Sequence, residues 1–304
     1  MKVLLAGASG AIGRALVRQL NAAGETVIGM ARSPQAARVL ADAGAESILA
    51  DALDATAVKD ALMQVRPDAV INELTALPRR YTPEEMRAAG PRDSEVRLNG
   101  NANLLAGTQA AGVRRYLLQS SGFWYEPGPG LAQEDAQFAF DATPGIAAGA
   151  RTYAELESAA FSNGNLEVVA LRYGFFYGPG TWFTREGDVG EQVRQGQVPI
   201  IGEGRGVWNW VHTEDAARAT VAALHGAPGV YNIVDDYPAE QRIWLPAFAR
   251  YVGAAAPPQV TEEQALESAG ADAVYYATRL RGASNAKAKR ELNFHPRPLE
   301  WLAN

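Results

Sequence analysis

Short apolar segments alternate with amphipathic segments over the first 180 residues of the chain. Uninterrupted apolar runs are typical of strands buried in a parallel sheet, and one-sided apolar patterns with helical spacing are typical of the helices that cover it. Alternation of strands and helices predicts a doubly wound parallel sheet, the Rossmann-type α/β fold. The predicted strands are residues 3–6, 25–30, 47–50, 68–72, 115–119 and 167–172, and the predicted helices are residues 11–20, 35–43, 56–65, 93–111 and 150–162.

After Gly180 this regular alternation ends. The pattern there predicts helices at 186–195, 213–224, 240–252 and 285–292 and short strands at 198–201, 207–211 and 230–234. We therefore predict two units. The Rossmann domain covers residues 1–180 and also receives about 207–225, and a smaller C-terminal α+β lobe covers residues 181–304 and binds the substrate.

The turn between the first strand and the first helix carries three glycines. Gly7 can adopt a positive φ, Gly10 has no Cβ to keep a phosphate from the backbone, and Gly13 lets the helix pack close to the strand. The positive N-terminal end of the helix then faces the phosphate. An ordinary βα turn is the alternative, but this context favours a dinucleotide site. Its predicted members are Gly7, Ser9, Gly10, Ala11, Ile12 and Gly13.

The end of the second predicted strand indicates which dinucleotide binds. NAD sites usually place a carboxylate about 20 residues beyond the glycine turn, where it binds the ribose 2′-hydroxyl, whereas an arginine accommodates a 2′-phosphate. This chain has Arg32 and Ser33 there and no carboxylate. We therefore predict NADP in preference to NAD, with a merely solvated Arg32 as the alternative.

Residues at the other strand ends are further candidates, because ligands of open α/β sheets bind beyond the carboxyl ends of the strands. Asp51, which precedes Ala52, would accept a hydrogen bond from an adenine amino group or cap the next turn. The Pro- and Arg-rich residues 78–91 are predicted to form a loop that acts as a lid. The remaining predicted cofactor contacts are Leu74, Thr75, Ala76, Gln119, Tyr173, Gly174 and Phe175.

Composition narrows the choice of partner. The net charge is −6, and no run of five or six like charges occurs, so nothing indicates binding to nucleic acid or to a membrane. The chain has no cysteine and only three scattered histidines, so we predict no metal site. No stretch resembles a signal peptide or a membrane span, which predicts a cytoplasmic protein with a small-molecule substrate.

With these motifs in place, the chain resembles the extended or atypical short-chain dehydrogenase/reductase superfamily, the NAD-dependent epimerase/dehydratase group. The resemblance covers nearly the whole chain and implies the fold and a nicotinamide cofactor. Its motifs are the glycine turn, Asp51, Ser120-Ser121 followed by Tyr125, Leu171-Arg172 before Tyr177-Gly178-Pro179-Gly180, the segment 210–217, Tyr231-Asn232-Ile233, and the C-terminal Asn285 to Leu292 with Pro296.

The resemblance also implies a catalytic Ser and a Tyr-x-x-x-Lys dyad, in which the Lys lowers the pKa of the Tyr. Ser121 matches the Ser. Tyr153 lies on the expected helix, but Glu157 stands four residues later, where the Lys belongs. In a second alignment Arg151 replaces the Lys and Ala147 replaces the Tyr. In both alignments the usual dyad is broken.

Three functions remain open. In the first, the chain is an NADP-dependent oxidoreductase or epimerase acting on a small carbonyl or a nucleotide sugar. Arg151 would then grip the nicotinamide ribose, Ser121 would polarise the carbonyl, and Tyr153, Tyr125 or a water would supply the proton. The second is a catalytically silent NADP-binding sensor, and the third is a non-redox lyase or isomerase.

Aromatic residues near the strand ends predict an apolar or stacking substrate pocket between the lobes. Trp208 and Trp210 are expected to be interlobe core, and His212 to be structural. Arg205 and Arg281 are candidates for a substrate phosphate. The resemblance also suggests a homodimer through residues 93–111 and 150–162. The predicted substrate contacts are Tyr125, Phe176, Tyr177, Trp182 and Arg281.

Overall fold

The computed structural model describes residues 1–302 and has a parallel sheet at its centre. In this range seven strands pair in the order β11-β6-β5-β4-β1-β2-β3, so the chain reverses its direction of winding beside β1. All six strands predicted for the first domain are present, with ends shifted by one or two residues. The sheet strands are β1 Lys2–Ala6, β2 Thr26–Ala31, β3 Glu46–Leu49, β4 Ala69–Asn72, β5 Arg115–Ser121, β6 Glu167–Tyr173 and β11 Gly229–Ile233.

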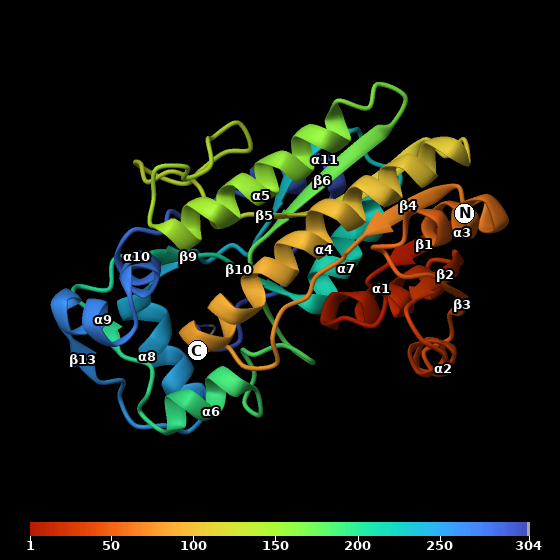
Figure 1. Ribbon diagram of the computed structural model, residues 1–304. Coiled ribbons are helices and arrows are strands. Elements are labelled where there is room, and N and C mark those ends of the chain that lie inside the picture. Colours follow the sequence, from red (N-terminus) through yellow and green to blue (C-terminus); the bar gives the residue numbers. More distant parts are fainter. Residues whose placement is uncertain (303–304) are drawn as a thin grey trace.

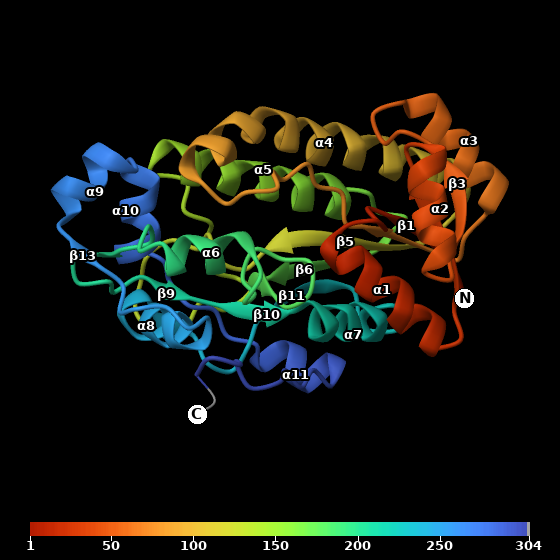
Figure 2. The same cartoon turned by 90° about the horizontal axis from the view of Figure 1, so that it is seen from below.

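Helices cover both faces of this sheet (Figures 1 and 2). One face carries α3, α4 and α5, which pack side by side. The other face carries α1, α2, α7 and α11, with α1 against α7. The bounds of these helices are α1 Ala11–Ala22, α2 Pro34–Asp42, α3 Ala55–Val65, α4 Pro83–Ala110, α5 Pro144–Phe161, α7 Thr213–Ala223 and α11 Ala286–Leu292.

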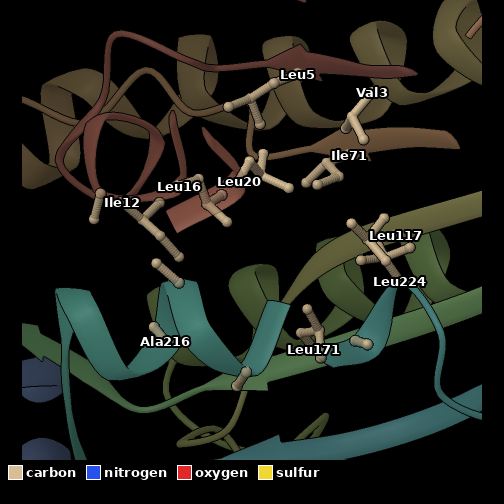
Figure 3. Close-up of a cluster of buried hydrophobic side chains, with 14 of the residues drawn as sticks. Val3, Leu5, Ile12, Leu16, Leu20, Ile71, Leu117, Leu171, Ala216 and Leu224 are labelled. Atoms are coloured by element: carbon tan, nitrogen blue, oxygen red, sulfur yellow. The ribbon is translucent and has the colours of Figure 1, made fainter. Parts of the chain in front are cut away.

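A cluster of buried apolar side chains lies between the sheet and the α1–α7 layer (Figure 3). Leu16 and Leu20 of α1 point at the strands, and Ala216 of α7 packs against the same cluster. Small residues on α7 allow the two helices to approach closely, because their side chains leave little volume between the backbones. This packing holds α1, and with it the glycine turn at its N-terminus, in a defined position on the sheet.

The second lobe is smaller than predicted, because part of its sequence belongs to the central sheet. We expected residues 230–234 and 285–292 in that lobe, but β11 pairs with β6 in parallel and α11 packs on β11. The connection from β6 to β11 includes α7, and this crossover brings the chain back parallel to β6 at the edge of the sheet. The lobe itself consists of α6 Asp188–Arg194, α8 Gln241–Tyr251, α9 Glu262–Ser268, α10 Ala271–Thr278 and the short strands β7 Phe175–Tyr177, β8 Ile200–Ile201, β9 Val207–Trp208, β10 Trp210–His212, β12 Ala239–Glu240 and β13 Gln259–Val260.

The predicted lid is wrong for most of its length. Helix α4 begins at Pro83, about ten residues before the predicted start, and continues through Pro91. The Thr82 hydroxyl caps the helix by accepting a hydrogen bond from Glu85 N at 3.2 Å, and a proline in the first turn needs no hydrogen-bond partner for its missing N–H.

Within residues 1–302 no helix is long and apolar enough to cross a membrane.

Candidate functional site

The glycine turn has the geometry of a dinucleotide cradle. Gly7 has φ +84°, and a Cβ there would lie 2.3 Å from the carbonyl oxygen of Glu73. A Cβ on Gly13 would lie 2.3 Å from the carbonyl oxygen of Gly7, so both positions admit only glycine. A Cβ on Gly10 would meet only the Gly7 carbonyl oxygen within 4 Å, which leaves its outer side open. Gly10 is also the N-cap of α1, whose first N–H groups are therefore available to a phosphate.

The residues predicted to contact the adenosine half lie around this turn. Arg32 is exposed at the end of β2, while Ser33 accepts a hydrogen bond from Ala36 N at 3.2 Å and caps α2. Asp51 is exposed, and its Oδ1 accepts from Leu53 N at 3.0 Å, so it forms the predicted turn cap. The role of Asp51 toward adenine stays a prediction, as does that of Arg32 toward a 2′-phosphate.

The segment after β4 is tied to α4. Ala76 N donates to Asp93 Oδ1 at 2.6 Å, and Leu74 N donates to Asn72 Oδ1 at 3.1 Å. Glu73, which the sequence did not single out, is buried at the carboxyl end of β4. Its only sequence signal is a carboxylate that directly follows an apolar strand. Burial raises its pKa to about 8, against the opposing effects of the Tyr173 hydroxyl and the Arg97 charge.

Arg97 on α4 is the second functional residue that the sequence analysis missed. Its guanidinium is buried and held by Asp93 Oδ2 at 2.7 Å and by Gln119 Oε1 at 3.1 Å. Its central carbon lies 4.9 Å from the centre of the Tyr153 ring. Asp93 and Arg97 are four residues apart on one helix, a spacing that the sequence showed. Burial raises the pKa of Tyr153 to about 12, while Arg97 acts in the opposite direction.

Glu157, the residue in place of the dyad lysine, is part of a buried ion pair. Arg172 Nε and Nη2 donate to its two carboxylate oxygens at 2.8 and 2.7 Å. Ser120 Oγ donates to Glu157 Oε1 at 2.5 Å. Both oxygens of Glu157 are therefore engaged by residues of β5 and β6. This arrangement links α5 to the sheet.

The second alignment of the dyad places its cation elsewhere. Arg151 is exposed and donates through Nη2 to the carbonyl oxygen of Phe140 at 2.9 Å. Tyr153, by contrast, faces α4, so the two side chains leave α5 on different sides. Ser121 is buried at the end of β5, beside Tyr173 of β6. Arg151 is thus bound to the surface loop, and its predicted contact with the nicotinamide ribose stays a prediction.

Aromatic side chains from both lobes form one connected cluster next to Tyr153. Trp124 lies 5.5 Å from Tyr153 between ring centres and donates through Nε1 to Tyr276 Oη at 2.9 Å. Phe123 stacks on Phe175 at 4.1 Å. Trp208 and Trp210 are buried here, as predicted for interlobe core. The partly exposed members are Tyr81, Phe123, Trp124, Trp182 and Tyr276.

Not every predicted substrate contact lies at this cluster. Trp182 does, since its ring is 4.9 Å from that of Tyr81, and Phe176 is half-buried against Tyr173. Tyr177 belongs to the same cluster, but it is fully buried there, between His212 and Trp301. Phe176 and Tyr177 are neighbours in the sequence, but successive residues of a strand point to opposite faces, so the two side chains have different surroundings.

Tyr125 and the two candidate phosphate-binding arginines are also structural. Tyr125 is fully buried, donates to Asn232 and accepts from Arg172 Nη1 at 3.0 Å, so it is neither a substrate contact nor a proton donor. Arg281 donates to the carbonyl oxygens of Gly130 and Pro129, at 3.0 and 2.9 Å, and anchors the loop before α5. Arg205 forms an exposed pair with Glu203.

His212 has the structural role predicted for it. Its Nδ1 accepts a hydrogen bond from Glu214 N at 3.1 Å and caps α7. Burial lowers its pKa, and the nearby Arg297 lowers it further. The side chain is therefore held neutral by its surroundings, as a capping acceptor requires.

Comparison with known proteins adds to this geometry. Residues 3–233 match the model of the NAD dependent epimerase/dehydratase family. The chain is 38% identical to 3-diazoavenalumate denitrifying reductase from a Streptomyces species, over 99% of this chain and 98% of that protein. It is 29% identical to 2-alkyl-3-oxoalkanoate reductase from Stenotrophomonas maltophilia, over 75% of this chain and 67% of the relative.

Solved structures show the same fold. UDP-glucose 4-epimerase from Thermus thermophilus, in complex with NAD, is 25% identical, with a TM-score of 0.72 over 99% of this chain and 96% of the other. dTDP-glucose 4,6-dehydratase from Streptomyces venezuelae, also with NAD, has a TM-score of 0.76 at 22% identity over 99% and 93% of the two chains.

Proposed function

Since the chain belongs to the NAD dependent epimerase/dehydratase family, we propose that it is a reductase that transfers hydride from NADPH to an aromatic diazo compound. The observation that carries the proposal is the surroundings of Tyr153. Glu157 occupies the position of the dyad lysine, and the carboxylate of Glu157 is bound to Arg172. Replacement of a diazonium group by hydrogen consumes a hydride and no proton. It therefore needs no Tyr–Lys acid.

Two further observations support this substrate class. The relative of 38% identity is named for the reduction of a diazo compound with loss of nitrogen, and the two chains match over nearly their full length. The aromatic cluster beside Tyr153 offers partly exposed ring faces, which attract cationic and planar aromatic groups. A diazonium ion on an aromatic ring has both properties.

The residues of the cradle fit a nicotinamide dinucleotide. The open side of Gly10 and the N-terminus of α1 would hold the pyrophosphate, and Arg32 favours the 2′-phosphate of NADP. The two solved relatives are complexes with NAD, so the preference of this chain for NADP or NAD has to be measured. Titration of the protein with NADPH and NADH, followed by nucleotide fluorescence, is expected to give the lower Kd for NADPH.

The protein's own groups would orient the two reactants. Buried Arg97, held by Asp93 and Gln119, fixes the Tyr153 ring as one wall of the site. Phe123 and Trp124 would exclude water and hold the substrate ring. A dinucleotide held by the glycine turn would supply a hydride, whose electron pair would form the new C–H bond while the electron pair of the C–N bond leaves with N₂.

The test is a reaction of the full chain with an arenediazonium carboxylate and NADPH carrying deuterium at C4. We expect NADPH consumption, one N₂ released per NADPH, and deuterium on the ring carbon that carried the diazo group. A mixture without protein corrects for spontaneous diazonium loss. NADPH binding without consumption would overturn the diazo-reductase proposal and leave carbonyl reduction and the silent NADP-binding protein.

A second candidate is carbonyl reduction, which the relative of 29% identity supports by its name. The favouring observation is Arg97, which places a cation 4.9 Å from the Tyr153 ring and opposes the rise in its pKa. Tyr153 would then donate a proton to the carbonyl oxygen. In that case Tyr153→Phe should lower kcat about 100-fold or more, whereas diazo reduction should not depend on the hydroxyl.

A further inference from the structure

Glu73 lies where the dinucleotide would bind. It follows β4 directly, and its backbone and Cβ form the surface against which the Gly7 turn packs. Its side chain is only 3% exposed. One carboxyl oxygen, Oε2, is buried and has no hydrogen-bond partner within residues 1–302. An unpaired buried carboxyl oxygen is costly unless the group is neutral or a ligand completes its hydrogen bonds.

The other oxygen belongs to a chain of three contacts. Glu73 Oε1 lies 3.1 Å from Tyr173 Oη, which lies 2.6 Å from Thr220 Oγ1. Thr220 Oγ1 donates its proton to the carbonyl oxygen of Ala216 at 2.8 Å. In the contact between Tyr173 and Thr220 either hydroxyl can be the donor. Tyr173 Oη donates to Glu73 Oε1, so Oε2 is the carboxyl oxygen that is left without a partner within residues 1–302.

Burial favours the neutral acid form of Glu73, and it outweighs the hydroxyl of Tyr173 and the charge of Arg97, which both lower the pKa of Glu73. Tyr173 approaches from β6, Arg97 from α4 and Tyr153 from α5. The only cation among these is already paired with Asp93 at 2.7 Å. Burial consequently dominates and raises the pKa of Glu73 to about 8.

We propose that Glu73 is a cofactor-binding residue that must be a neutral carboxylic acid while the dinucleotide is bound. This inference rests on the proposed function, because it requires a dinucleotide at the Gly7 turn. The pyrophosphate is anionic, and an ionised Glu73 behind the turn would repel it through a poorly solvated interior. Glu73 holds its proton below its pKa and loses it above, so cofactor affinity is lost as the pH rises.

The test measures the Kd of NADPH between pH 6.5 and 9.5 for the full chain and for Glu73→Gln, by nucleotide fluorescence. In the wild type, Kd should rise above pH 8 with a limiting slope of about tenfold per pH unit, as for loss of one required proton. Glu73→Gln keeps the shape of the neutral acid, so its Kd should stay constant over this range. Glu167→Gln, at the amino end of β6, is the matched control and should keep the wild-type slope.

A second measurement does not depend on the folding of the variant. Calorimetric titration of the wild type with NADPH at pH 8.5, in two buffers of different ionisation enthalpy, should show proton uptake on binding. A wild-type Kd that is constant with pH, or equal slopes for wild type and Glu73→Gln, would overturn this inference alone. Absence of NADPH binding at every pH would overturn the proposed function and this inference together.

Discussion

At the scale of single residues, Glu157 has a structural role at a position where the family resemblance implies a catalytic lysine. It stands where the dyad lysine belongs, and its carboxylate pairs with Arg172 across the interface between α5 and the sheet. The cation nearest to Tyr153 comes instead from Arg97, on another helix. The pair of Glu157 with Arg172 therefore fixes α5 on β6.

Glu157→Gln should strongly destabilise the protein. It leaves the Arg172 guanidinium buried without its counter-ion, and breaking a buried pair on one side costs about 3–5 kcal/mol. The free energy of unfolding is measured by urea denaturation at pH 7. Glu155→Gln, exposed on the same helix, is the control and should change this free energy by less than about 0.5 kcal/mol. A loss no larger than that of the control would contradict the structural role of Glu157.

At the scale of elements, α4 shows how a helix longer than predicted changes the site. Its additional N-terminal turns replace most of the predicted lid, and its body carries Asp93 and Arg97 to the end of β5. The loop between β5 and α5 is held differently. Two of its carbonyl groups, on Pro129 and Gly130, bind the side chain of Arg281 from the distant second lobe.

Arg281→Ala should loosen that loop without weakening the cofactor site. Loss of the guanidinium leaves the two carbonyl groups to water, so we expect faster deuterium exchange of amides in residues 126–143. The Kd of NADPH should stay within about twofold, because this loop does not touch the glycine turn. Arg205→Ala, which removes only an exposed pair with Glu203, is the control. Unchanged exchange in the Arg281 variant would refute the anchoring role.

At the scale of the whole molecule, the Rossmann domain is not a continuous piece of chain. α7 packs on α1, β11 completes the sheet beside β6, and α11 covers β11. Buried residues of all three elements belong to the same apolar cluster as β1 and α1. The domain that holds the cofactor is therefore finished only after most of the second lobe has been synthesised.

A fragment of residues 1–180 should consequently fail to fold. It lacks α7, β11 and α11, so the apolar faces of α1 and β6 would be exposed to water. We expect a broad, non-cooperative urea transition and no detectable NADPH binding, whereas the full chain unfolds cooperatively and binds. A fragment that unfolds cooperatively and binds NADPH would show that the first 180 residues suffice.

The sequence by itself determined the order of strands and helices and the glycine turn. These features are encoded locally, by apolar runs, by helical spacing and by glycines that no other residue can replace. The sequence also shows Glu157 four residues after Tyr153, because spacing along one helix is visible in the chain. The sequence did not determine where helices begin or whether residues 78–91 form a loop, since a proline is compatible with either a loop or the first turn of a helix.

Only the tertiary structure decided which side chains meet. The approach of Arg97 to Tyr153, the burial of Glu73 and the loss of Tyr125, Tyr177 and Arg281 from the substrate site depend on contacts between distant segments. Charge state and accessibility follow from such contacts, because both depend on the surroundings of a group and not on its neighbours in sequence. For the same reason β11 could be predicted as a strand, but its place in the central sheet could not.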